Sequence, residues 1–201
     1  MVYMNVLEYL GYQPVSNETG TFLDHGVTEM MDTYQVVLAR PKDIPCIPDI
    51  ERAAVQLLEE YAPASVQEEI TLEQDLREAQ SDGRLWVALL GDSPVGFAHV
   101  IILDSGLAHL EELDVHPDHG RRGLGRRLVT QVFQWVRNLG YSSLTLTTFR
   151  EPRFNMPFYK SLGFEELPKD LQTAELRQIV DHETQRGLDP NTRAVMIWQP
   201  R

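Results

Sequence analysis

The sequence of 201 residues has little of several features that mark other protein classes. It holds a single cysteine, Cys46, so no disulfide can form within the chain, and we expect a cytoplasmic location. No lysine or arginine precedes Arg40, whereas secretory and mitochondrial leaders carry positive charge early. The longest apolar stretch, near residues 95–103, is about half the length of a membrane span. We therefore expect neither a leader nor contact with a membrane.

Positive charge is also scarce, except in one segment. The chain carries 18 lysines and arginines against 30 aspartates and glutamates, for a formal net charge of -12. Residues 119–153 reverse this balance with seven arginines and one glutamate. A nucleic-acid-binding domain usually carries its basic excess over the whole domain, so we expect no nucleic-acid partner. A basic segment on an acidic chain suits a small anionic ligand, although a solvated helix face would explain the arginines as well.

The length and composition are those of one globular domain with a sizeable core. We expect the domain to span residues 34–201 and residues 1–33 to be an extension packed on it. Residue patterns predict the elements of this domain in order. They are a strand at 34–40, helices at 49–61 and 71–83, strands at 84–90, 94–103 and 109–115, a helix at 124–139, a strand at 143–149, helices at 155–162 and 174–186, and a strand at 194–199.

Two details of these helices can be predicted closely. Thr71 and Gln74 have the spacing of a capping box, so we expect Thr71 to cap the second helix. The helix at 124–139 has one apolar stripe that we expect to be buried: Leu124, Leu128, Val132, Val136 and Leu139. The order of elements indicates a mixed α/β fold, with the strand, helix and strand at 109–149 as its parallel unit.

A turn rich in glycine and arginine, HGRRGLGRRLV at 119–129, joins a strand to this helix. Glycine lets the backbone approach a ligand, and the first turn of a helix presents unpaired N–H groups, so phosphate is the expected ligand. Gly123 and Gly125 begin a dinucleotide fingerprint, but Leu128 replaces its third glycine. The chain has no Gly-Lys pair, so a Walker loop is excluded as well.

Two segments together resemble the GNAT superfamily of acyl-CoA-dependent N-acyltransferases. They are DVHPDHGRRGLGRRLV at 114–129 and, after a strand, NMPFYKSLGF at 155–164. The resemblance covers roughly residues 34–199. It implies a mixed, mostly antiparallel central sheet with splayed parallel strands and helices on both faces. It also implies acetyl-CoA as cosubstrate, an acceptor pocket formed by residues 46–82 and 149–155, and a homodimer as one assembly to test.

The resemblance also implies which residues hold coenzyme A. The pantetheine arm would lie along Leu113, Asp114 and Val115. The pyrophosphate would meet the turn and the start of the helix, at Arg121, Arg122, Gly123, Leu124, Gly125 and Arg126. The sequence departs from the family at Gly120, where glutamine or arginine is usual, and at Pro152, where many members have asparagine. Asn155 is a further candidate for the cofactor, with a helix cap as the alternative.

Acetyl transfer to an amine needs a base and an acid, because roughly one alkylamine molecule in a thousand is neutral at pH 7. The resemblance implies Tyr159 as the acid, with a purely structural aromatic residue as the alternative. Side chains alternate along a strand, which puts His109 and Glu111 on one face with Leu113 and Val115 unless a bulge intervenes. His109 or Glu111 is the expected base and Glu112 is the third choice, whereas a solvated strand face would leave all three without a role.

We therefore expect an N-acetyltransferase that moves an acetyl group from acetyl-CoA to a primary amine of a small molecule or peptide, by direct attack in a ternary complex. The alternative is a non-catalytic acyl-CoA-binding or regulatory module of the same fold. His116, Asp118 and His119 lie close together in sequence, but their spacing is not typical of metal ligands, and we expect no metal site.

Overall fold

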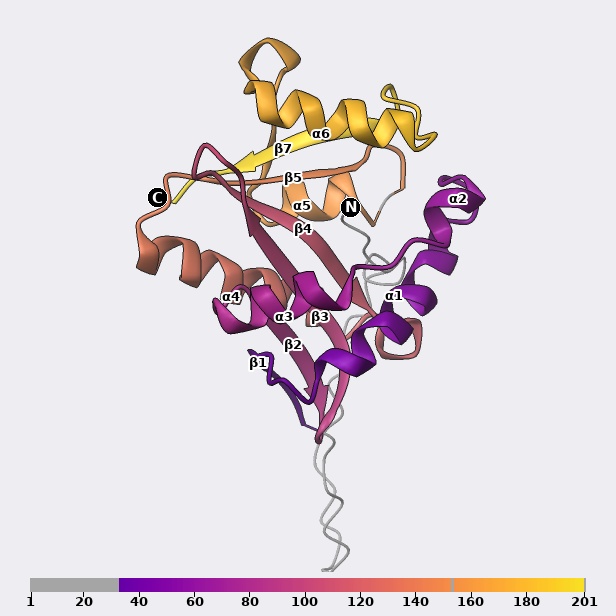
Figure 1. The fold of residues 1–201 in the computed structure, drawn as a ribbon, viewed down its shortest axis with the longest axis vertical. Helices are drawn as coiled ribbons and strands as arrows, with labels where there is room; N and C mark the ends of the chain where they lie inside the picture. The colour runs from indigo at the N-terminus through magenta and orange to yellow at the C-terminus, as the bar shows by residue number, and fades with distance from the viewer. Residues whose placement is uncertain (1–32, 153, 201) are drawn as a thin grey trace, which may run out of the picture.

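The computed structural model describes residues 33–152 and 154–200 (Figure 1). The expected extension therefore lies, except for Thr33, outside the described residues. The described strands form one sheet in the order β1-β2-β3-β4-β5-β7-β6. They are β1 (Tyr34–Leu38), β2 (Leu85–Leu90), β3 (Ser93–Ile102), β4 (Ala108–Val115), β5 (Leu144–Phe149), β6 (Glu165–Glu166) and β7 (Arg193–Trp198).

All neighbouring strands of this sheet pair antiparallel except β4 and β5, which are parallel. The described helices are α1 (Ile47–Val55), α2 (Ala64–Gln67), α3 (Glu73–Ser81), α4 (Leu124–Leu139), α5 (Met156–Ser161) and α6 (Ala174–Gln185). The expected mixed α/β fold, with a mostly antiparallel sheet and one parallel strand–helix–strand unit, is confirmed.

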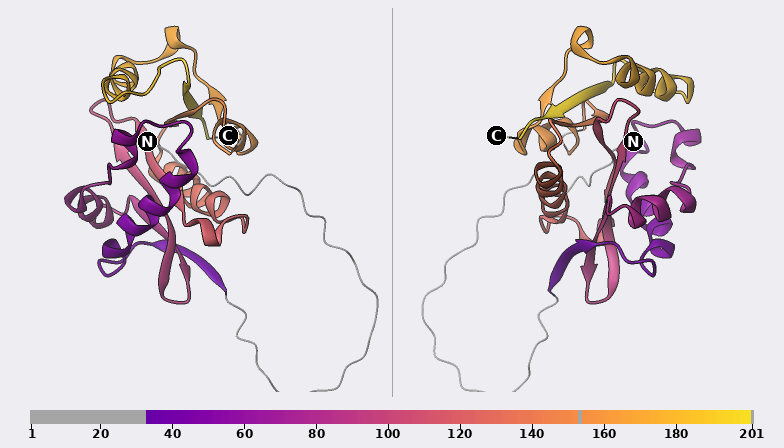
Figure 2. Two further views of the ribbon diagram at one scale, coloured as in Figure 1. Left: turned by 90° about the vertical axis from the view of Figure 1, so that its right-hand side faces the viewer. Right: turned by 60° about the vertical axis from the view of Figure 1, so that its left-hand side comes forward.

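Helices cover both faces of the sheet, and the side chains of β2, which point alternately to the two faces, show why. Trp86 and Ala88 point into a core shared with α4, whereas Leu85, Val87 and Leu89 point into a core shared with α1 and α3. Figure 2 shows α4 on one side of the sheet and α1 and α3 on the other. Because both faces are buried, β2 is an almost continuous apolar run rather than an alternating one.

Two of the closer predictions are wrong. Thr71 does not cap α3: the cap is Leu72, and Thr71 instead donates through its amide and hydroxyl to the carboxylate of Glu51 on α1. Leu139 is 61% exposed, while the other four residues of its stripe are buried, because α4 extends past the sheet in its last turn. The short elements α2 and β6 have no periodic pattern to predict them.

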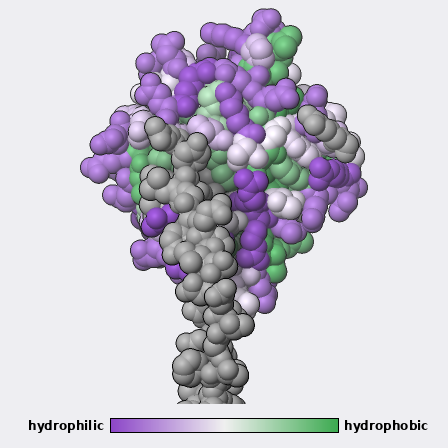
Figure 3. All heavy atoms as spheres, turned by 180° about the vertical axis from the view of Figure 1, so that it is seen from behind, coloured by the Kyte–Doolittle hydropathy of each residue, from purple (hydrophilic) through white to green (hydrophobic). Residues whose placement is uncertain are grey.

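The face seen in Figure 3 is largely hydrophilic, with smaller hydrophobic areas between the polar side chains. Across the described residues, no helix combines the length and the apolar character needed to cross a membrane.

Candidate active site

The strands β4 and β5 separate along their length. They pair only at their amino-terminal ends, where Ala108 lies opposite Leu144 and His109 opposite Thr145. From there β4 stays paired with β3, while β5 pairs with β7 (Figure 1). The edge of β4 that carries Leu113, Asp114 and Val115 therefore faces a gap between β4 and β5 in the sheet.

A bulge in β4 changes which side chains share a face. His99 of β3 lies opposite Glu112, and Val100 lies opposite Leu110, so Glu111 has no opposing residue on β3. Leu110, Leu113 and Val115 all pack in the core on the α4 side. The prediction that Leu113 and Val115 share a face with His109 and Glu111 is therefore wrong, because the extra residue reverses the alternation.

The opposite side of β4 gathers the titratable groups. His109, Glu112 and Asp114 alternate with the core residues and so lie toward α1 and α3, together with the bulged Glu111. His109, Glu112 and Asp114 are buried, whereas the side chain of Glu111 is 37% exposed. The bulge thus brings the three candidate bases to one side of the sheet and leaves Glu111 the most accessible of them.

His109 is held in one orientation by Thr145. The Thr145 hydroxyl donates to the carbonyl oxygen of Ala108, so it accepts from Nδ1 of His109 at 2.9 Å. The other ring nitrogen, Nε2, then carries the lone pair and lies 4.0 Å from the carboxylate of Glu111. Burial lowers the pKa of His109 to about 4, so the ring is neutral at pH 7.

Two further buried groups lie beside these residues. His99, opposite Glu112, is only 3% exposed, and burial lowers its pKa to about 4. Burial raises the pKa of Glu112 to about 8. Burial also raises the pKa of Asp114, with Glu112 and Glu51 adding repulsion between carboxylates. Neither carboxyl oxygen of Asp114 has a hydrogen-bond partner within the described part of the chain.

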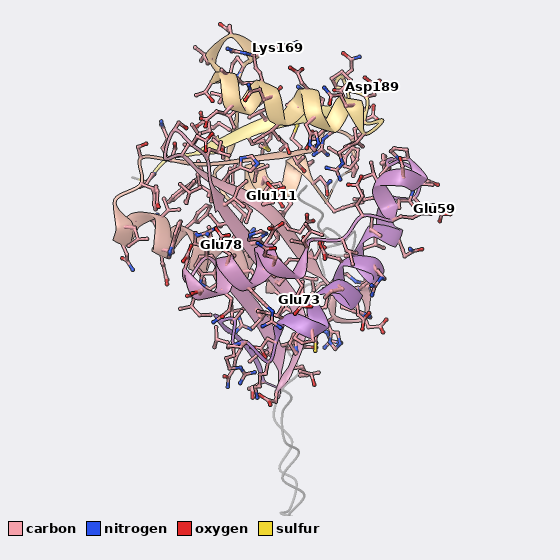
Figure 4. The ribbon with its side chains drawn as sticks, in the orientation of Figure 1. Glu59, Glu73, Glu78, Glu111, Lys169 and Asp189 are labelled. Atoms are coloured by element: carbon pink, nitrogen blue, oxygen red, sulfur yellow. The ribbon has the colours of Figure 1, made fainter. Side chains whose placement is uncertain are left out.

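A cavity of about 900 Å³ opens in front of Glu111. It lies between α1, the segment before α3, α3 itself, the β3–β4 surface and the end of α6. Figure 4 shows Glu111 between α3, which carries Glu78, and α6. The cavity is lined by two arginines, Arg84 and Arg186, and by seven residues with carboxyl groups. These seven are Glu51, Glu69, Asp75, Glu78, Asp82, Glu111 and Glu112.

The expected acceptor pocket is only partly matched by this cavity. The contribution from residues 46–82 agrees with its lining, but among the described residues of 149–155 none lines it. Instead the lining includes His182 of α6 and Arg186, which follows that helix and forms an ion pair with Glu69. His99, Glu51 and this part of α6 were missed by sequence reasoning, because β3 and α6 lie far from the motif residues in the chain.

The glycine–arginine turn lies at the end of β4 and leads into α4. Arg121 and Gly123 both have left-handed backbone conformations, with φ values of 58° and 70°. A left-handed residue costs about 1–2 kcal/mol when it is not glycine, so the strain at Arg121 marks a constrained turn. Turns with left-handed residues and the first turns of helices both present backbone N–H groups that suit an anion.

The arginines of the turn make different contacts. Arg127 donates to the carbonyl oxygen of Tyr34 at 2.8 Å, and Arg122 lies over the ring of Tyr34, 5.5 Å from its centroid. Arg126 donates to the hydroxyl of Ser161 on α5 at 3.1 Å. Within the turn Leu124 is buried, so only its backbone amide can face a ligand. The cluster therefore fixes α4 against β1 and α5 as well as supplying positive charge.

Tyr159 and Asn155 lie apart from the carboxyl-lined cavity. Both are completely buried, and Tyr159 packs edge-on against Phe158 and Phe164 in the core shared with α4. Asn155 occupies the cap position of α5, but its side chain makes no capping hydrogen bond. Neither polar atom of that side chain has a partner in the regions described here. A side-chain cap thus does not account for Asn155, which leaves two buried polar atoms for another ligand.

A metal site finds no support among the residues with described positions, where no three His, Cys, Asp or Glu side chains are grouped to hold an ion. His116 and Asp118 stay local: the Asp118 amide donates to Nδ1 of His116. His119 accepts from, or donates to, the hydroxyl of Tyr34 at 3.0 Å.

Comparison with known proteins places these features in a family. The sequence profile of the acetyltransferase (GNAT) family matches residues 52–164, more than half of the chain. The chain is 30% identical over 86 residues to N-acetyltransferase 8 of Homo sapiens, a match that covers 40% of this chain and 38% of that protein. It therefore spans less than two fifths of that relative's length.

Solved structures show the same fold. The PaiA N-acetyltransferase of Thermoplasma acidophilum, in complex with coenzyme A, aligns with a TM-score of 0.64 at 13% identity, over 84% of this chain and 99% of that one. The N-acetylglutamate synthase of Neisseria gonorrhoeae, with coenzyme A and N-acetyl-glutamate, aligns with a TM-score of 0.61 at 17% identity. That alignment covers 84% of this chain and 35% of the synthase chain.

Proposed function

The chain belongs to the GNAT acetyltransferase family, and on that premise we propose that it transfers the acetyl group of acetyl-CoA to a primary amine. The observation that carries the proposal is the position of Glu111. This carboxylate projects from the bulge of β4 into the cavity, at the strand whose far end leads into the anion-binding turn. An acceptor in the cavity and a thioester in the gap between β4 and β5 would meet along the same strand.

Coenzyme A is assigned to the gap and the turn. The pyrophosphate would be held by the amides of Arg121 through Arg126, and the pantetheine arm by the edge of β4 that faces β5, at Leu113, Asp114 and Val115. The left-handed conformations in the turn and the short β4–β5 pairing fit this assignment. The relatives crystallised with coenzyme A support it at the level of the fold.

Glu111 is the base in this proposal. His109 is buried and does not line the cavity. Glu111 lines the cavity and is accessible, so it can take a proton from the ammonium form of the acceptor, directly or through a water molecule. The lone pair of His109 Nε2 lies 4.0 Å from this carboxylate, so a water molecule or an ammonium group between the two could donate to both.

The chemical step is a direct attack. The amine nitrogen forms a bond to the thioester carbonyl carbon, the C–S bond breaks, and Tyr159 gives its hydroxyl proton to the departing thiolate. The nitrogen loses its extra proton to water as the amide forms, and Tyr159 regains a proton from water. A backbone amide near Leu113 would polarise the carbonyl oxygen while negative charge develops on it. The cytoplasmic location, the homodimer and the packing of residues 1–33 stay predictions.

Thermal unfolding with added ligands tests the proposal. Acetyl-CoA at about 100 times its dissociation constant should stabilise the chain by about 2.7 kcal/mol, roughly 5–10 °C in Tm, whereas NAD and ATP should not. Amine-dependent thiol release from acetyl-CoA should then follow. Binding without thiol release for any amine would favour the non-catalytic acyl-CoA-binding module, and a shift with NAD or ATP alone would overturn the assignment of the turn.

A further inference from the structure

Three residues at the glycine–arginine turn contact a single residue of β1, Tyr34. The Tyr34 hydroxyl is hydrogen-bonded to Nδ1 of His119 at 3.0 Å, and the guanidinium of Arg122 lies over the Tyr34 ring, 5.5 Å from its centroid. Arg127, near the start of α4, donates to the Tyr34 carbonyl oxygen at 2.8 Å. Tyr34 thus meets the turn through three different groups, although it precedes His119 by 85 residues.

These contacts tie the middle of the turn to the sheet. At the beginning of the turn the His116 amide donates to the carbonyl oxygen of Val95 on β3, and at its end Leu124 is buried in the core. Between these two points the His119 amide donates to His116, within the same loop. Tyr34 adds a tie from the middle of the turn to β1, which pairs with β2 along its length.

The contacts with Tyr34 lie on both sides of the strained residue of the turn. Arg121 has a left-handed φ of 58°, and it stands two residues after His119 and one residue before Arg122. A residue other than glycine keeps such a conformation only where the surrounding structure imposes it. Tyr34 is placed to impose it, because it holds the chain before and after Arg121.

Tyr34 also restricts the side chain of Arg122, which is exposed and lies at a distance typical of a cation–π contact. A long side chain that is already ordered loses less freedom when it binds a phosphate. Burial lowers the pKa of His119, and repulsion from His116 and Arg122 lowers it further. Arg122 therefore belongs to a region of positive groups that suits a phosphate.

From these contacts we infer that Tyr34 is a positioning residue of the coenzyme A site. It holds His119 and Arg122 on either side of Arg121, so that the turn already has the shape that receives the phosphates before the coenzyme arrives. The inference rests on the proposed binding of coenzyme A and adds to it a residue of β1, outside both motifs. Tyr34 acts through the turn and not by touching the reacting atoms.

Two substitutions at Tyr34 provide the test. Tyr34→Phe removes the hydrogen bond to His119 but keeps the ring, whereas Tyr34→Leu removes the ring as well and keeps an apolar side chain. The dissociation constant of coenzyme A, measured by titration calorimetry, should rise about threefold in Tyr34→Phe and about tenfold in Tyr34→Leu. That of pantetheine, which has no phosphate, should change in neither.

Unchanged affinity for coenzyme A in both variants would overturn the inference. Equal weakening of coenzyme A and pantetheine would overturn it as well, since a general loosening of the fold affects both ligands. Tyr34→Phe decides the matter by itself if Tyr34→Leu does not fold. Tyr141→Phe and Tyr141→Leu are matched controls, because Tyr141 is also a half-buried tyrosine packed against the core shared with α4, and they should change neither affinity.

A double-mutant cycle tests whether the hydroxyl acts through the turn. In a chain that carries His119→Ala, the hydroxyl of Tyr34 has lost its partner in the turn. Adding Tyr34→Phe to that chain should therefore leave the dissociation constant of coenzyme A nearly unchanged. The same threefold rise with and without His119 would overturn the inference, because the hydroxyl would then act independently of the turn.

Binding of coenzyme A is measured without an amine, which separates this inference from the proposed transfer. A chain that binds coenzyme A but releases no thiol with any amine fails the proposed activity, and the Tyr34 variants still decide the inference. Normal thiol release together with equal affinities in the wild type and the Tyr34 variants overturns the inference alone. A wild type that does not bind coenzyme A overturns both.

Discussion

At the scale of single residues, the extra residue at Glu111 decides the layout of the site. Without the bulge, Glu112 and Asp114 would share the face of Leu110 and pack toward α4. With it, these carboxyls and His109 all lie toward the cavity side, while Leu113 takes the core position. One inserted residue thus gathers four titratable groups of β4 beside one cavity, where burial shifts the pKa values of several of them.

Replacing Tyr159 by phenylalanine tests the proposed acid. Because the thiolate would then leave without a proton donor, kcat should fall by roughly 10²–10⁴-fold, with little change in the dissociation constant of acetyl-CoA. Steady-state kinetics and thermal-shift titration measure the two quantities. Tyr141→Phe, which alters a tyrosine stacked on Trp135, serves as the control and should keep full turnover. Unchanged turnover in Tyr159→Phe would show that the acid is assigned wrongly.

The raised pKa of Glu112 gives a prediction for stability against pH. The unfolded carboxyl titrates near 4.5 and the folded one near 8, so between these values the folded chain keeps a proton that the unfolded chain has lost. The contribution of this group to the free energy of unfolding is therefore fully present below about pH 4.5, falls as the pH rises, and is lost once the pH has passed about 8.

The variant Glu112→Gln has no such titration. Relative to it, the wild type should lose at least about 1 kcal/mol between pH 5 and pH 9, roughly 2–4 °C in Tm. Thermal unfolding of both proteins across that range measures the difference. Glu73→Gln, which neutralises an exposed carboxylate on α3, is the control. A constant difference between Glu112→Gln and the wild type would contradict the raised pKa.

At the scale of elements, the turn before α4 joins the parallel unit to the ligand site. The strand β4 ends at Val115, a short turn follows, and α4 begins at Leu124 with Gly123 at its cap position. Gly123 has a left-handed φ of 70°, and the amides of the first turn of α4 follow it directly. The helix then packs its apolar face on the sheet, which fixes the position of those amides.

Gly123→Ala and Gly91→Ala form a matched pair for this turn. Both glycines have a left-handed φ, 70° and 60°, and a Cβ at either would meet no atom within 4 Å. Each alanine should therefore cost a similar 1–2 kcal/mol of stability, about the left-handed penalty. Only Gly123→Ala should also weaken acetyl-CoA binding, by about tenfold, as measured by titration calorimetry. Equal affinities in the two variants would remove the turn from the cofactor site.

At the scale of the whole molecule, charge is divided between two sites. The turn and α4 carry a group of arginines on a chain with net charge -12, and the cavity beyond β4 is lined by carboxylates. The sheet separates the α4 side from the α1 and α3 side (Figure 2). An anionic cosubstrate and a cationic acceptor would thus each be attracted to its own region without competing for the other.

Salt should weaken the binding of coenzyme A. Raising NaCl from 0.1 to 1 M shortens the Debye length from about 10 to about 3 Å, so exposed arginines attract the phosphates less. The dissociation constant of coenzyme A should rise by roughly tenfold, whereas that of pantetheine, which has no phosphate, should stay nearly constant. Titration at both salt concentrations measures this. A salt-independent affinity for coenzyme A would mean that the arginines do not face its phosphates.

The sequence alone determined the order of the elements, the fold class and the position of the glycine–arginine turn. These features depend on local signals: apolar periodicity, glycine at left-handed positions and two motifs at fixed separation. The candidate residues of β4 and of the turn could be named for the same reason, since each lies within or beside a motif, and their roles stay predictions. The basic segment could also be recognised from composition, because four of its seven arginines lie within the turn segment 119–129.

Only the tertiary structure decided which face each β4 side chain occupies and what lines the cavity. The bulge arises from the pairing of β4 with β3, a register that no residue of β4 specifies by itself. His99, Glu51 and Arg186 line the cavity from three separate parts of the chain. Thr71 does not cap α3 as expected but donates to Glu51, because folding brings these two residues together. Contacts between residues distant in the chain depend on packing, which local patterns do not encode.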